Sequence, residues 1–62
     1  MNKLEQTLKQ QGVTQSTLAK ILNVSRQSVH HWIKGNNDPD KKHMKRIADY
    51  LGVSILELFF DE

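Results

Sequence analysis

The sequence predicts an all-α domain of five short helices, and two observations support that fold class. Apolar residues recur at spacings of three and four along the 62-residue chain, and no stretch alternates with period two for long enough to indicate a strand. Glycines stand where helices would end, and hydroxyl residues stand where helices would begin. The endings are Gly12, Gly35 and Gly52, and the beginnings are Thr14, Ser25 and Ser54.

Each helix has one apolar stripe of the kind that faces a protein core. The helices are expected over residues 2–11, 15–22, 26–34, 40–51 and 55–60. The residues expected to face inward are, in chain order, Leu4, Leu8, Leu18, Ala19, Leu22, Val29, Trp32, Met44, Ile47, Ala48, Leu51, Ile55, Leu58 and Phe59. Five stripes around one centre make a single compact domain, here residues 1–62.

The composition limits the classes of protein to consider. With no cysteine, the chain has neither a disulfide nor a thiolate metal site. No apolar run approaches the roughly 20 residues that cross a bilayer, and no signal segment opens the chain, so we expect a cytoplasmic protein. The formal net charge is +2, and no Asp or Glu occurs between residues 6 and 37. A basic segment of this kind weakly favours a polyanionic partner.

The connection between the second and third helices consists of residues 23–25 only. A link this short forces the sharp crossing of a helix-turn-helix. Ala19 is small enough for the close contact, and Val24 and Val29 would close the angle. Asn23 stands where the turn needs a positive φ, which Asn tolerates best after Gly.

The segment QSTLAKILNVSRQSVHHWIKG resembles the helix-turn-helix of the Cro and repressor family, also called Xre-like. The family pattern is roughly Q-x-x-L-A-x-x-x-G-V-S-x-x-x-[IV]-x-x-W-x-x-G, followed by a loop with proline. The positions that match are Gln15, Leu18, Ala19, Val24, Ser25, Val29, Trp32, Gly35 and Pro39. The tail IADYLGVSILELF also resembles the family's last two helices, so the likeness covers about residues 3 to 59. It implies the lambda-repressor-like five-helix fold.

Four positions depart from the family pattern. Asn23 replaces the usual turn glycine, and His30 stands where serine is frequent. Ile33 stands where glutamate is frequent, and Leu56 where the last helix usually carries an acidic residue. The first departure bears on stability, and the other three bear on specificity and assembly.

The resemblance implies DNA binding with the third helix in the major groove. The expected base contacts are Arg26, Gln27, His30 and His31, and the expected backbone contacts are Gln15, Thr17, Ser28, Lys34, Asn36 and Asn37. The residue types agree with these roles, because Arg pairs with guanine and Gln with adenine. We expect His31 to face the bases and His30 to reach a phosphate or an adjacent base.

Several features have a plainer interpretation. His30 and His31 are adjacent, which is not the spacing of a metal pair on a helix, so no metal is expected; plain solvent exposure stays open for them. Trp32 is expected in the core rather than as a stacking platform. The KKHMKR run at residues 41–46 is either a solvated face, a contact to DNA, or a set of partners for Asp38, Asp40 and Asp49.

Leu56 and Phe60 lie off the inward face of the last helix and indicate a homodimer interface. The alternative is that both side chains belong to the core of this small domain. The first hypothesis is therefore a stand-alone Cro-like repressor that binds a pseudo-palindromic operator as a dimer. The second is an antitoxin or interaction module in which Ile33, Leu56 and Phe60 are exposed and face another protein. An enzyme is the poorest class, since no acid–base pair, metal cluster or phosphate loop is present; no cofactor or small-molecule ligand is expected.

Overall fold

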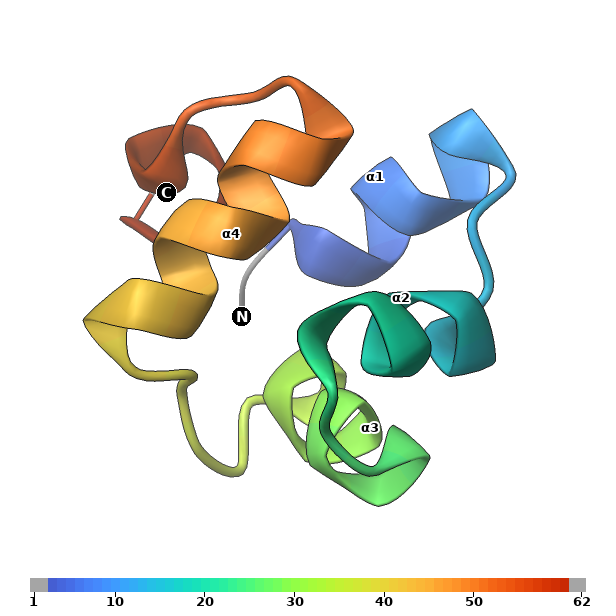
Figure 1. Ribbon diagram of the computed structural model, residues 1–62. Helices are drawn as coiled ribbons and strands as arrows, with labels where there is room; N and C mark the ends of the chain where they lie inside the picture. The colour runs from blue at the N-terminus through green and yellow to red at the C-terminus, as the bar shows by residue number, and fades with distance from the viewer. Residues whose placement is uncertain (1–2, 61–62) are drawn as a thin grey trace.

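A computed structural model describes residues 3–60, and over that range the protein consists of four α-helices and one short π-helix (Figure 1). The elements are α1 (Leu4–Gln11), α2 (Gln15–Leu22), α3 (Arg26–Lys34), α4 (Lys41–Leu51) and η1 (Leu56–Phe60). The all-α prediction is confirmed, and no strand occurs in the described range. Residue 2, the predicted start of the first helix, lies outside the described residues. Within them, no helix is both long and apolar enough to cross a membrane.

Figure 1 shows α2 and α3 packed together at one end of the molecule and the C-terminal turn η1 at the other, while α4 contacts α2. The chain between α2 and α3 has the short turn that the sequence predicts. The two ends of the domain meet, because the Lys3 amide donates to the Leu58 carbonyl oxygen at 2.9 Å.

The helix starts follow the predicted capping with one addition. The side chains of Thr14, Ser25 and Ser54 each accept a hydrogen bond from the amide three residues later, at 3.0–3.1 Å. Asp40 does the same for the His43 amide at 2.9 Å, so α4 begins at Lys41 and not at residue 40. A carboxylate is a strong N-cap because it satisfies a free amide at the positive end of the helix dipole.

All four α-helices end in a left-handed residue, at Gly12, Asn23, Gly35 and Gly52. Within residues 3–60, Asn23, with φ of 58°, is the one residue other than glycine that has a positive φ, as its place in the turn predicts. The next amide then reaches back to a carbonyl five residues earlier, which completes a Schellman ending. These bonds are Val13 to Leu8, Val24 to Ala19, Asn36 to His31 and Val53 to Ala48, at 2.9–3.1 Å.

The core agrees with the predicted inward faces except at a few positions. Trp32 is buried, with 6% of its surface exposed, which confirms a core role. Ile33 is also buried, at 7% exposure, so the expectation that it faces solvent is wrong. The physical reason is its place on α3, four residues after Val29 and next to Trp32 on the inner face. Ile55 and Phe59 pack against the core but stay half-buried.

Two side chains connect α4 to neighbouring helices by donating hydrogen bonds to backbone carbonyls. Gln11 Nε2 donates to the Leu51 carbonyl at 2.6 Å, and Arg46 Nη2 donates to the Ile21 carbonyl at 2.8 Å. Both acceptors lie in the last turn of a helix, where carbonyls lack helical partners. The arginine contact places a cation at the negative end of α2, beside the helix-turn-helix turn.

Candidate nucleic-acid interface

Three exposed polar side chains on the outer face of α3 are candidates for contact with DNA bases. Arg26, Gln27 and His30 are exposed, while Val29, Trp32 and Ile33 hold the opposite face in the core. The apolar face thus fixes the rotation of the helix, and the three polar side chains extend away from the domain. Such a helix, held by a partner helix and presented outward, fits the width of the DNA major groove.

Ser28 is not a fully outward residue. It is half-buried, and its Oγ lies 3.0 Å from Ser25 Oγ while its amide donates to the same hydroxyl. These bonds tie the first turn of α3 to its own cap. Ser28 therefore helps to hold the start of α3 in place, and its hydroxyl has one hydrogen-bond partner within the protein.

His31 differs from His30 in having a defined partner. Its Nδ1 lies 3.1 Å from the side-chain nitrogen of Asn36, and the ring is partly exposed. His30 is exposed and makes no side-chain hydrogen bond to any residue of the range 3–60. The two rings meet edge to face with centroids 6.3 Å apart. The sequence-based interpretation gave the two histidines separate roles, and their surroundings do differ.

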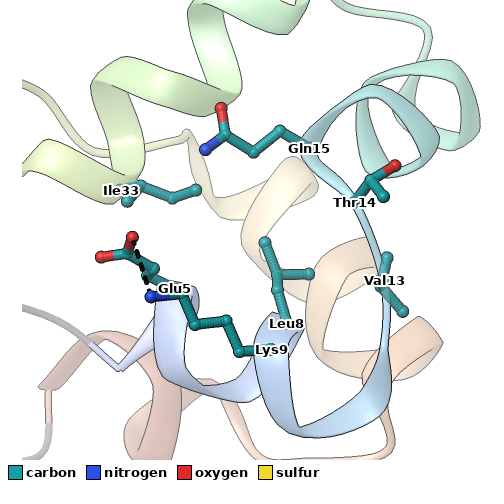
Figure 2. Close-up of a pocket in the computed structure, with 7 residues that line it drawn as sticks. All are labelled: Glu5, Leu8, Lys9, Val13, Thr14, Gln15 and Ile33. Carbon is teal, nitrogen blue, oxygen red and sulfur yellow. Dashed lines mark ion pairs between the residues drawn. The ribbon is translucent and has the colours of Figure 1, made fainter.

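The start of α2 brings two further candidate residues to the surface. Thr17 is exposed, and its hydroxyl accepts a hydrogen bond from the Thr14 hydroxyl at 2.9 Å. Gln15 is half-buried, and Figure 2 shows it extending from the start of α2 toward Ile33. Both side chains lie beside the free amides at the positive end of α2, an environment that suits an anion.

Gln15 also borders a shallow hollow of about 200 Å³ between α1, α2 and α3. Figure 2 shows the ion pair between Glu5 and Lys9 at its edge, with 3.7 Å between the charged atoms. Both side chains of this pair are largely exposed, so it contributes little to stability. The buried side chain of Ile33 forms one wall of the hollow. The hollow is therefore an open gap where three helices pack together, and not an enclosed site.

The charges near α3 are basic. Lys20, Arg26 and Lys34 are exposed, and the sequence has no acidic residue from 6 to 37. Lys34 lies in the last turn of α3, where Asn36 and Asn37 follow on the exposed loop. A polyanion approaching α3 would therefore meet positive charge and polar groups along one face.

The KKHMKR run is divided between internal partners and solvent. Lys45 pairs with Asp49 at 3.3 Å, and His43 Nδ1 lies 2.8 Å from Asp40 Oδ1 and against the Trp32 ring. Of the three predicted interpretations, pairing with Asp40 and Asp49 is confirmed for these two side chains. The pKa of the Asp40 carboxyl lies below its ordinary value, first because the His43 amide donates to it and then because of the His43 side chain.

Three large apolar side chains on α4 and η1 are exposed among residues 3–60. Leu56 is 70% exposed, Phe60 is 58% exposed and Tyr50 is 45% exposed. The first two were predicted from the sequence as a dimer interface. Tyr50 was missed, although its position off the inward stripe of α4 was a usable signal.

The fold and the outward face of α3 define the class as a helix-turn-helix domain. The profile of the helix-turn-helix family matches residues 4–58. A protein of Methanocaldococcus jannaschii, named an uncharacterized HTH-type transcriptional regulator, is 41% identical over 61 residues, which make up 98% of this chain and 92% of that protein. The chain belongs to the helix-turn-helix family of DNA-binding transcription regulators, which are typically not enzymes.

Proposed function

We propose that the protein is a Cro-like repressor that inserts α3 into the major groove of an operator. The observation that supports this most is the outward row of Arg26, Gln27 and His30 on a helix whose other face is locked in the core. Arginine and glutamine read guanine and adenine through paired hydrogen bonds. His31 joins these three as the fourth base contact, from a partly exposed position one residue further along.

The phosphate contacts come from the residues that flank this row. The proposed contacts are Gln15, Thr17, Ser28, Lys34, Asn36 and Asn37. The amides at the start of α2 add a fixed positive potential beside Gln15 and Thr17. Since such contacts release counterions, the affinity should fall steeply with salt.

A homodimer through Leu56 and Phe60 would complete the site. Both side chains are exposed, and η1 lies away from α3 (Figure 1), so pairing there leaves α3 free to enter the groove. A symmetric pair then reads a pseudo-palindrome whose half-sites lie about 34 Å apart, one turn of DNA.

A partner-dependent regulator, such as an antitoxin, is the second candidate. The exposed apolar side chains of Tyr50, Leu56 and Phe60 favour it, because they offer another protein a surface. Ile33 no longer supports this candidate, since it is buried.

The decisive experiment is selection of bound duplexes from a random pool by the protein alone, followed by gel shifts. Recovery of a symmetric sequence, with affinity that falls as salt rises, supports the repressor. Binding only after a partner protein is added supports the second candidate. Within the selected site, Gln27→Ala should relax the preference at one base pair, at a cost of about 1–3 kcal/mol. Lys34→Ala should weaken all sequences alike and make the salt dependence shallower.

A further inference from the structure

The end of α3 differs from the other helix ends in one respect. In a Schellman ending, the residue after the left-handed position folds back over the residue five positions earlier, and an apolar contact normally accompanies the backbone bond. At α1, α2 and α4 the returning residue is a valine that packs against the core: Val13, Val24 and Val53. At α3 the returning residue is Asn36, and it meets His31.

The contact between these two side chains links the tautomer of His31 to the orientation of the Asn36 amide. The Asn36 side-chain nitrogen lies 3.1 Å from His31 Nδ1, and an NH2 group donates and does not accept. In this amide orientation Nδ1 is the acceptor, and the proton of a neutral imidazole resides on Nε2. The opposite amide orientation would place the Asn36 oxygen there and match a proton on Nδ1 instead.

We propose that Asn36 is a positioning residue that fixes His31 as a hydrogen-bond donor toward DNA. The Nε2–H group makes no hydrogen bond within residues 3–60, and the ring is partly exposed, so this donor is available to a ligand. In the major groove a single donor matches an acceptor, and guanine offers two neighbouring acceptors, N7 and O6. Cytosine offers the N4 donor at that edge, so His31 discriminates against it.

This inference rests on the proposed function, since it assigns the base preference of one residue of the same site. It also gives Asn36 a role in addition to the phosphate contact proposed above. The adjacent Asn37 has no hydrogen bond to another residue of the described range, which makes it a matched control. His30 supplies a second control, because it is exposed and has no such partner.

The test has one arm without DNA. Nitrogen NMR of the free protein at mildly alkaline pH, where imidazole is neutral, distinguishes protonated from unprotonated ring nitrogens. We expect His31 to hold its proton on Nε2 and His30 to show a solvent mixture of tautomers. Asn36→Val, which copies the other three helix ends, should return His31 to the mixture. Asn36→Asp, whose carboxylate only accepts, should place a proton on Nδ1, and Asn37→Val should leave His31 unchanged.

The second arm measures base preference with selected duplexes and their single-base variants. Asn36→Val and Asn36→Asp should reduce the preference for guanine over cytosine at one position by roughly tenfold, the scale of one lost base contact. Asn37→Val should weaken all the duplexes alike and preserve that preference. Thermal melting of each variant verifies that the fold is retained.

Each negative result has a distinct meaning. A wild-type His31 with its proton on Nδ1, or with the same mixture as His30, would overturn the proposal. So would an Asn36→Asp variant with unchanged base preference. If the free protein gives the expected tautomer but the wild type selects no sequence, the proposed function fails, and the base-reading part of this proposal fails with it while the Asn36–His31 assignment stands.

Discussion

The end of α3 and the end of α2 share one backbone geometry and use it for different purposes. Each has a left-handed residue, followed by an amide that bonds to a carbonyl five residues back. At α2 the returning side chain is Val24, which packs against the core from within the turn of the helix-turn-helix. At α3 it is Asn36, which stays exposed and holds His31. The backbone motif therefore ends the helix, and one side chain decides whether that end packs against the core or stays at the surface beside His31.

The largest change in stability is expected when the two kinds of side chain are exchanged between these helix ends. Val24→Asn should lower stability by about 1–2 kcal/mol, because a partly buried valine is lost and an amide is set against the core. The melting temperature of a domain this small should fall by roughly 4–8 °C per kcal/mol. The reverse exchange, Asn36→Val, should change stability by less than about 0.5 kcal/mol, as expected of an exposed site. Equal losses for the two variants would mean that both ends have the same role.

Replacing the glycine at the end of α3 distinguishes the strain of a positive φ from the effect of displacing the Asn36 side chain. Gly35 has φ of 79°, and an added Cβ would meet no atom within 4 Å, so Gly35→Ala costs only conformational strain, about 1 kcal/mol. The matched control is Gly52→Ala, with φ of 72° and equally free space. Thermal melting should show similar losses for both variants. Only Gly35→Ala should alter the His31 nitrogen signals, because it displaces Asn36; a change in both would contradict the local link.

A substitution at the end of α2 is expected to raise the stability of the domain instead of lowering it. Asn23 occupies the left-handed position with φ of 58°, where glycine is free of Cβ strain. Asn23→Gly should stabilise the domain by about 0.5 kcal/mol, with part of the gain offset by the greater freedom of glycine in the unfolded chain. Chemical denaturation should show a higher midpoint with an unchanged slope. Destabilisation would indicate that the Asn23 side chain contributes more than its backbone conformation.

The helix ends and starts also show which features of the structure could be predicted from the sequence. The left-handed residues, three of the four N-caps and the burial of Trp32 follow from local rules that link neighbours three or four positions apart. The Asn36–His31 contact spans five residues and exists only because Gly35 reverses the chain, so helical periodicity contains no signal for it. A polar residue one position after a C-terminal glycine, with a histidine five residues earlier, is the pattern that would have found it.

Ile33 illustrates a different kind of error. Its spacing from Val29 places it on the inner face of α3, and it is buried there. The inward face predicted for the third helix includes only Val29 and Trp32 and leaves Ile33 outside it. Spacing by three and four from Val29, applied to every apolar residue of this helix, also includes Ile33, so the error came from an incomplete use of the spacing rule.

The helix starts can be compared in the same way as the helix ends, and the expected effect of a substitution on stability is smaller there. Thr14, Ser25 and Ser54 cap with hydroxyls, whereas Asp40 caps α4 with a carboxylate whose pKa is lowered, chiefly by the hydrogen bond from the His43 amide. Because the folded-state pKa lies below the unfolded value, the stabilisation is present above about pH 4 and is lost as pH falls through the folded-state pKa.

Asp40→Ser keeps a capping oxygen of the kind used at the other three starts and removes this titration. The difference in melting temperature between wild type and Asp40→Ser should therefore shrink between about pH 5 and pH 2.5. Contributions of the other ionisable groups are present in both proteins and cancel in the difference. A difference that stays constant across the window would show that Asp40 acts through its shape as a cap and not through its charge. In that case the four helix starts that have a side-chain cap would be equivalent, and among the capped starts and the helix ends only the ends would differ in role.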